Sequence, residues 1–178
     1  MPNTNNFLFT TLKIIAWIIF VGLCIEAGGL LVNFIFSIYK PEFLPNLYQK
    51  VDLTELYRES RWAFYQSYSF IVAIAILKAI LFYTVILLMS KMDLNKPFTS
   101  FVSKKISTIA YYTFAIGILS YLARQTQKNL LKSNFDLSKL NEFWADSQAF
   151  ILMSAVIYII AVIFKKGIAL QEENDLTV

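Results

Sequence analysis

The sequence predicts an all-α integral membrane protein: a four-helix bundle with short interfacial helices in its two longer loops. The first observation is composition, since 57% of the 178 residues are hydrophobic and only 16% are charged. A soluble domain is nearer half apolar and about a quarter charged. The second observation is that the excess falls in four runs of span length. The third is that polar residues inside these runs recur on one helical face. We expect a single membrane domain.

Each run lies between polar or charged segments. The first ends at Lys40-Pro41, and the fourth is closed by Lys165-Lys166. The third and fourth runs are short and must borrow flanking residues, because a span needs roughly 20 residues. The first run is too long for a signal-peptide core, so we expect it to be retained. The predicted spans are residues 14–39, 67–90, 106–123 and 148–165.

The two longer loops carry apolar residues at helical spacing. In the first, such residues follow Asp52 as far as Phe64. In the second, Asp136 is a suitable N-cap for a segment that continues to Trp144. Short helices lying in the membrane interface account for both patterns.

The distribution of lysine predicts the orientation. Four lysines and one acidic residue surround the short connection between the second and third runs, whereas the first loop balances four bases with four acids. Because basic residues concentrate on the cytoplasmic side, we expect both termini in the cytoplasm. The same lysines could alternatively bind anionic lipid headgroups.

Glu26 and Lys78 each lie near the middle of a predicted span. A charge at that depth costs about 2.5–3.5 kcal/mol on insertion scales, so it usually faces a partner or a water-filled cavity. One interpretation is a structural ion pair between consecutive helices; a second is an ion or substrate path. The spans contain no internal proline and no evident repeat, which argues against transport. Pairing predicts that Glu26→Gln alone destabilises more than Glu26→Gln combined with Lys78→Met.

Small and polar residues at helical spacing predict the inward faces of the spans. Small residues let helices approach closely, and polar ones find partners there. The predicted seam residues are Gly22, Gly29 and Asn33 in the first span, Gly117 in the third and Tyr158 in the fourth.

The composition also argues against several kinds of site. The chain has no histidine and one cysteine, Cys24. The usual haem ligand, zinc ligand and general base near neutral pH are therefore missing. We predict no catalytic residue, no metal site and no cofactor. The net charge of +4 comes from basic residues scattered at the edges of the apolar runs, so we predict no direct binding of nucleic acid.

Residues 167–178 form a predicted cytoplasmic tail in which acidic residues follow the basic end of the fourth span. The terminal Leu-Thr-Val could add as a strand to the sheet edge of a partner. The simpler alternative is a frayed, solvated end. The predicted partner-binding residues are Leu170, Gln171, Glu172, Glu173, Asp175, Leu176, Thr177 and Val178.

This ending resembles the terminus of a bacterial family of small four-span membrane proteins of unknown function (YoaS-like). The segment from Asn95 to Thr99 is similar to that family's connection between spans two and three. The resemblance implies a bacterial inner membrane location. It also implies a cytoplasmic partner, because members commonly sit beside a small helix-turn-helix regulator. It implies no catalytic residues.

Three functions are compatible with these features. The favoured one is a non-enzymatic membrane regulator or anchor, whose tail and lysine-rich connection hold a soluble partner such as a helix-turn-helix regulator. A second is a small transporter or channel-like protein that uses Glu26 and Lys78. A third is a subunit of a larger membrane complex. Apart from the lipid bilayer, the sequence fixes no partner and no oligomeric state.

Overall fold

The computed structural model describes residues 2–40, 54–94, 96–131, 144 and 146–176. These residues form helices and no strand, which confirms the all-α class. Four of the helices are long and apolar enough to cross a membrane. The elements are α1 (Pro2–Tyr39), α2 (Thr54–Glu59), α3 (Arg61–Lys91), α4 (Ser100–Leu131) and α5 (Ser147–Leu176).

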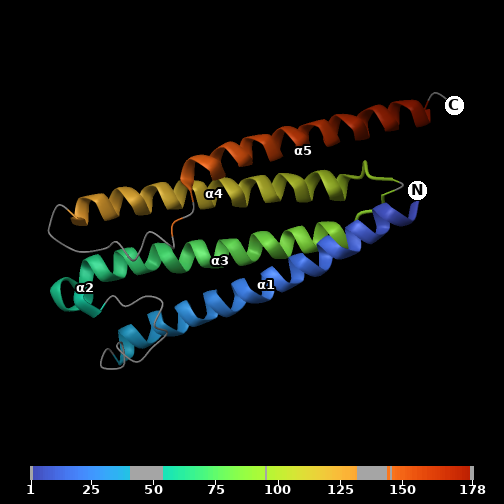
Figure 1. Cartoon of the computed structure of the whole chain (residues 1–178). Coiled ribbons are helices and arrows are strands. Elements are labelled where there is room, and N and C mark those ends of the chain that lie inside the picture. The colour runs from blue at the N-terminus through green and yellow to red at the C-terminus, as the bar shows by residue number, and fades with distance from the viewer. Residues whose placement is uncertain (1, 41–53, 95, 132–143, 145, 177–178) are drawn as a thin grey trace.

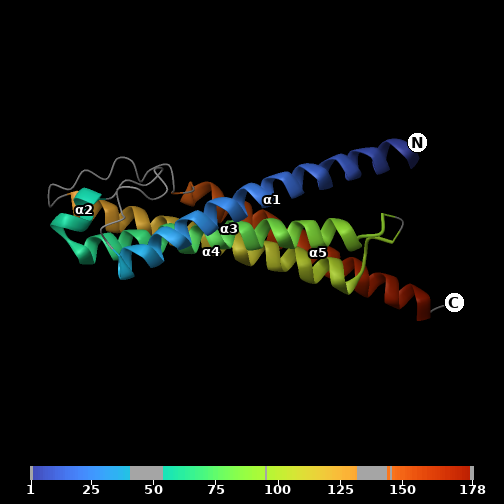
Figure 2. The ribbon, with the colours of Figure 1, turned by 90° about the horizontal axis from the view of Figure 1, so that it is seen from below.

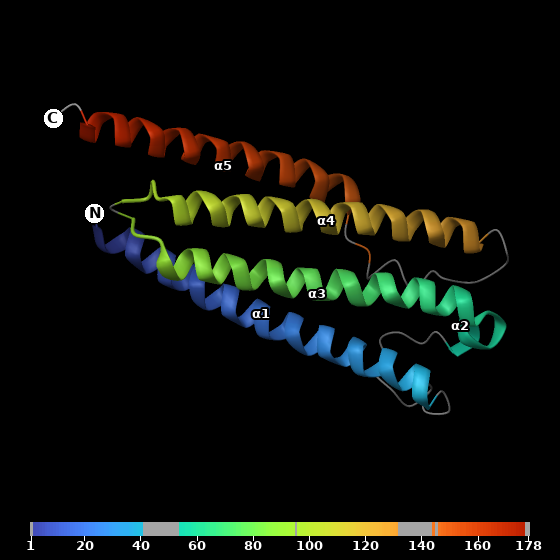
Figure 3. The ribbon, with the colours of Figure 1, turned by 180° about the vertical axis from the view of Figure 1, so that it is seen from behind.

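The four long helices lie antiparallel and side by side, in chain order (Figures 1 and 3). In the described part of the chain, α1 packs mainly on α3, α3 on α4, and α4 on α5. Both termini lie at the same end, and Figure 2 shows α1 and α5 spreading apart towards that end. In the most apolar 18-residue stretch of each helix, 44% of the residues are buried in α3 and in α4. The share is only 6% in α1 and 17% in α5. The outer helices therefore present most of their apolar surface to the surroundings.

Short polar side chains set where three of the long helices begin. The Ser60 hydroxyl accepts a hydrogen bond from the Ala63 N–H at 3.3 Å, and the Thr99 hydroxyl accepts one from the Val102 N–H at 3.3 Å. The Asp146 carboxylate accepts from two N–H groups in the first turn of α5, at 3.1 and 3.3 Å. Such caps satisfy backbone donors that have no partner within the helix. The cap of α4 starts this helix six residues before its predicted span, whereas α5 starts at Ser147 and gains its further length by continuing to Leu176.

The described parts of the two longer loops contain one short helix, α2, and one buried tryptophan, Trp144. Helix α2 covers part of the segment predicted to be helical in the first long loop, whereas Trp62 and Phe64 at the end of that segment belong to α3. The segment after Asp136 lies outside the described residues. Trp144, just before α5, is buried, and its indole Nε1 donates a hydrogen bond to the Gln127 side-chain oxygen at 2.7 Å. This bond links the residues just before α5 to the C-terminal part of α4.

An aromatic cluster joins α1, α2 and α3 at the end opposite the termini. The Phe64 ring is fully buried and lies 5.1 Å from the Tyr57 ring and 5.3 Å from the Tyr68 ring, between centroids. The Phe34 ring of α1 stacks on Tyr68 at 5.5 Å. The Tyr65 hydroxyl donates to the Ser37 carbonyl at 3.1 Å, which completes a polar link between α1 and α3.

Candidate functional site

Ring contacts fix the register of α1 against α3. Phe20 lies beside Tyr83, with ring centroids 5.6 Å apart, and Phe34 lies beside Tyr68. Interpolation between these two contacts places Glu26 beside residues 76–77 of α3. At a rise of 1.5 Å per residue, Glu26 is therefore within about 3 Å of the level of Lys78 along the helix axes. The structure thus brings the two charged residues to one depth.

The same structure does not bring the two charges into contact. Within the described residues, neither the Glu26 carboxylate nor the Lys78 ammonium makes a hydrogen bond or ion pair. At 3.6 residues per turn, Lys78 is turned about the α3 axis by roughly 80–140° from the tyrosines that contact α1. Both residues are half-buried at the flanks of their helices.

The predicted seam residues of α1 differ in their environment. Asn33 is buried, Gly29 is half-buried and Gly22 is exposed. A Cβ atom added at Gly22 would meet nothing within 4 Å, so no helix approaches closely there. The buried positions on this helix include Ala16 and Ala27, and Gly22 is turned about 140° from Ala27 at 3.6 residues per turn. Gly22 therefore lies off the seam that the sequence pattern assigned to it.

Gly117 of α4 lies at a close approach of α4 and α5. A Cβ atom there would stand 2.8 Å from the Ile151 side chain, 3.1 Å from the Ile151 nitrogen and 3.2 Å from the Ser147 carbonyl oxygen. Two of these three neighbours are backbone atoms, so only glycine fits without a shift. Further along the same seam, the Ser103 hydroxyl donates to the Ala161 carbonyl at 3.3 Å. Tyr158 lies at the edge, 47% exposed, with its ring 6.2 Å from that of Tyr111.

The connection between α3 and α4 is seated on α5. The Phe98 ring covers Gly167 so closely that a Cβ atom at this glycine would lie 2.7 Å from a ring carbon. The same ring lies 5.2 Å from the Phe164 ring, between centroids. We call this region the connection–tail surface, formed by residues 92–94 and 96–99 and by residues 164–174 of α5. Phe98 belongs to the segment noted for its resemblance, and Gly167 opens the predicted tail.

Lysine side chains surround the start of α4 beside this surface. The Lys91 and Lys105 ammonium groups lie 5.6 and 5.9 Å from the centroid of the Phe101 ring. Ammonium groups within about 6 Å of a ring face are attracted by its quadrupole. The predicted lysine cluster is thus held in part by an aromatic ring, next to the point where Phe98 meets α5.

The first part of the tail is helical. Helix α5 continues beyond Lys166 to Leu176, and Leu170 is 61% exposed. Glu172 and Glu173 are also exposed. A strand formed by Leu-Thr-Val would need Leu176 to leave this helix. Residues Thr177 and Val178 lie outside the described residues, so strand addition stays a prediction for these two positions alone.

Sequence reasoning missed the contact of Phe98 with Gly167 and that of Trp144 with Gln127. A glycine within a helix marks a close contact at Gly117 and Gly167 but not at Gly22, so its presence alone does not predict one. No local pattern indicates which ring would cover Gly167. Among the described residues, no group of three or more His, Cys, Asp or Glu side chains is placed to hold a metal ion.

Comparison with known proteins identifies a family. The curated proteins and the solved structures contain no match to this chain. A family model described as "Protein of unknown function (DUF2975)" matches residues 48–178, which is more than half of the chain. This segment includes α3, α4 and α5 and the connection–tail surface. This chain, with its four helices long and apolar enough to cross a membrane, therefore belongs to the DUF2975 family of proteins of unknown function.

Proposed function

We propose that this chain is a non-enzymatic membrane anchor or regulator, whose connection–tail surface binds a soluble partner in the cytoplasm. The observation that carries the proposal is the seating of Phe98 on Gly167. It joins the lysine-rich connection to the acidic end of α5, so that two segments 69 positions apart in the chain act as one surface.

The character of this surface supports protein binding. It combines an exposed apolar side chain, Leu170, with the exposed acidic side chains of Glu172 and Glu173 and with lysines near the connection. Apolar anchors surrounded by polar residues are typical of protein interfaces. The resemblance of the tail to the YoaS-like family favours a small helix-turn-helix regulator as the partner. We propose sequestration of this partner at the membrane, with release when the bundle shifts α5 against the connection.

The experiment is a crosslinked pull-down from native membranes. It compares the full chain, a chain that ends at Ala169, the variant Gly167→Val and the control Gly22→Val. Valine at position 167 collides with Phe98, whereas at position 22 it meets open space. We expect a soluble DNA-binding protein to be recovered with the full chain and with Gly22→Val. Recovery should be lost on truncation and reduced by Gly167→Val.

Equal recovery from all four chains, or no recovery, would contradict the proposal. Ion flux in liposomes that Glu26→Gln abolishes would then favour the small transporter. Glu26 and Lys78 do not line the two hollows that the described residues form between α4 and α5.

A further inference from the structure

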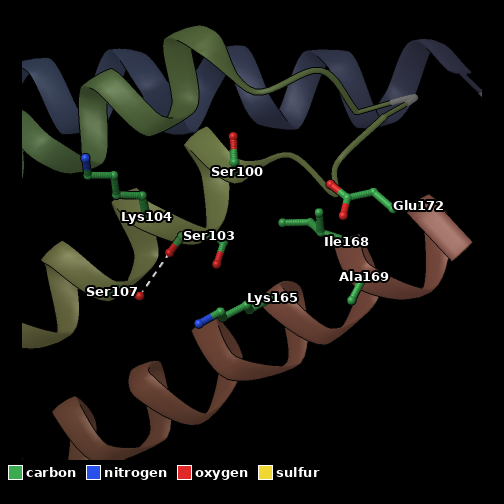
Figure 4. A pocket seen from close by; sticks show the side chains of 8 residues that line it. All are labelled: Ser100, Ser103, Lys104, Ser107, Lys165, Ile168, Ala169 and Glu172. Atoms are coloured by element: carbon green, nitrogen blue, oxygen red, sulfur yellow. Dashed lines mark hydrogen bonds between the residues drawn. The ribbon is translucent and has the colours of Figure 1, made fainter.

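Two hollows open along the junction of α4 and α5. The first has a volume of about 480 Å³ and is lined by serine and lysine side chains of α4 and by Lys165, Ile168 and Glu172 of α5 (Figure 4). The second has a volume of about 310 Å³ and an almost wholly apolar lining that includes Phe114 and Ala155.

The two hollows follow one another along the same faces of α4 and α5, and together they are called the groove. On α4, the lining residues Lys104, Ser107, Tyr111 and Phe114 recur every three or four positions, which places them on one helical face. On α5, the lining residues Tyr158, Lys165 and Glu172 recur every seven positions, which is also one face. The groove therefore has a charged mouth at one end and an apolar section that follows it along the same helices.

The mouth lies where the apolar runs end. Lys165 and Lys166 close the apolar run of α5, and the run of α4 begins at Ile106, just after Lys104. This is the level of lipid headgroups, and the apolar section lies at the level of lipid chains. A lipid is the molecule that presents a charged group and an apolar chain at these two depths. We call this feature the α4–α5 groove.

The order of the charges selects the headgroup. Lys165 is nearest the membrane core, and Glu172 lies seven residues further out, about 10 Å along the helix axis. In Figure 4 the Lys165 ammonium points towards Ser107, and the Glu172 carboxylate points towards the connection between α3 and α4. Within the described residues, neither charge has an ion-pair partner. Charge-assisted hydrogen bonds are about 2.8 Å long, so the spacing leaves room for a short dipolar group between the two.

We propose that the α4–α5 groove binds a phospholipid with a phosphoethanolamine headgroup. The phosphate, on the inner side of this headgroup, binds the Lys165 ammonium. The terminal ammonium, on the outer side, binds the Glu172 carboxylate. One acyl chain follows the apolar section past Tyr111 and Tyr158. Lys104, whose ammonium points away from Lys165 in Figure 4, adds positive potential at the mouth.

The test is native mass spectrometry of the purified full chain, titrated with phosphatidylethanolamine and with phosphatidylglycerol. Matched neighbours provide the controls: Lys166→Gln for Lys165→Gln, and Glu173→Gln for Glu172→Gln, because the neighbours carry the same charges but do not line the groove. We expect wild type to prefer phosphatidylethanolamine by up to about fivefold, which is the usual upper range for an ion pair at an exposed carboxylate such as Glu172. Glu172→Gln should abolish the preference, and Lys165→Gln should weaken both lipids.

Three results would overturn the proposal. Equal affinity of wild type for the two lipids would show that Glu172 does not bind the ammonium of the headgroup. Equal losses in the groove variants and in their neighbours would indicate nonspecific attraction to the surface. Binding of glycerophosphoethanolamine as tightly as the whole lipid would show that the ligand is a soluble phosphate compound and that the apolar section has no role.

Discussion

Two helix junctions in this molecule are built in opposite ways. Helices α1 and α3 meet through large rings, such as Phe34 on Tyr68 at 5.5 Å and Phe20 beside Tyr83 at 5.6 Å. Helices α4 and α5 meet through small residues, with no space for a Cβ atom at Gly117. In a membrane, helices associate largely through packing contacts and polar links. The first junction should therefore be sensitive to loss of volume, and the second to gain of volume.

The largest effect should come from removing volume at the ring-based junction. We expect Phe64→Ala to lower the free energy of unfolding by about 3–5 kcal/mol, because it empties a fully buried site among three tyrosine rings. The measurement is an SDS unfolding titration in mixed micelles. Trp62→Ala, at a position that is 77% exposed, is the control and should change stability far less. Equal losses from the two variants would argue against the aromatic cluster as the core of this junction.

An intermediate effect should come from adding volume at the small-residue junction. We expect Gly117→Val to destabilise by about 1–3 kcal/mol, the usual cost of overpacking, because backbone atoms of α5 leave no space. Gly22→Val should be neutral or slightly stabilising, since it meets nothing and valine has a higher helix propensity than glycine. The same unfolding titration measures both. If Gly117→Val matched Gly22→Val, α4 and α5 would have to be further apart than described.

These two glycines show what the sequence could and could not predict. Four apolar runs of span length were sufficient for the helices and for the all-α class. Gly22 and Gly117 each sit in a stripe of small and polar residues, so sequence pattern gave them the same role. Their environments differ because a neighbouring helix packs against Gly117 but not against Gly22. Which helix packs where is a property of the tertiary structure. The cover of Phe98 on Gly167 was missed for the same reason.

The smallest effect should come from the two membrane charges beside the ring-based junction. With no ion pair between Glu26 and Lys78 among the described contacts, we expect Glu26→Gln and Lys78→Met each to leave stability unchanged or to raise it. The double variant should then equal the sum of the single variants to within about 0.5 kcal/mol. A double-mutant cycle measures this coupling. A coupling of about 3–5 kcal/mol would instead support the buried ion pair that the sequence suggested.

For Glu26 and Lys78, the sequence predicts the depth in the membrane but not the direction of the side chain. The depth of Glu26 and Lys78 follows from counting residues along two antiparallel helices, and the structure places both at one level. The direction in which each side chain leaves its helix depends on how the helices rotate against their neighbours. On α3, that rotation is set by Tyr65, Tyr68 and Tyr83, which contact α1 and turn Lys78 aside.

The proposed role in the cytoplasm depends most directly on which side of the membrane the connection–tail surface occupies. Labelling of single cysteines tests this in a background in which the one native cysteine, Cys24, is replaced by alanine. Leu170→Cys lies in the exposed part of α5, and Lys40→Cys lies at the opposite end of the bundle, just after α1. A membrane-impermeant maleimide should label position 40 in intact cells and position 170 only in inverted vesicles. Labelling of position 170 in intact cells would place the surface outside and contradict the account.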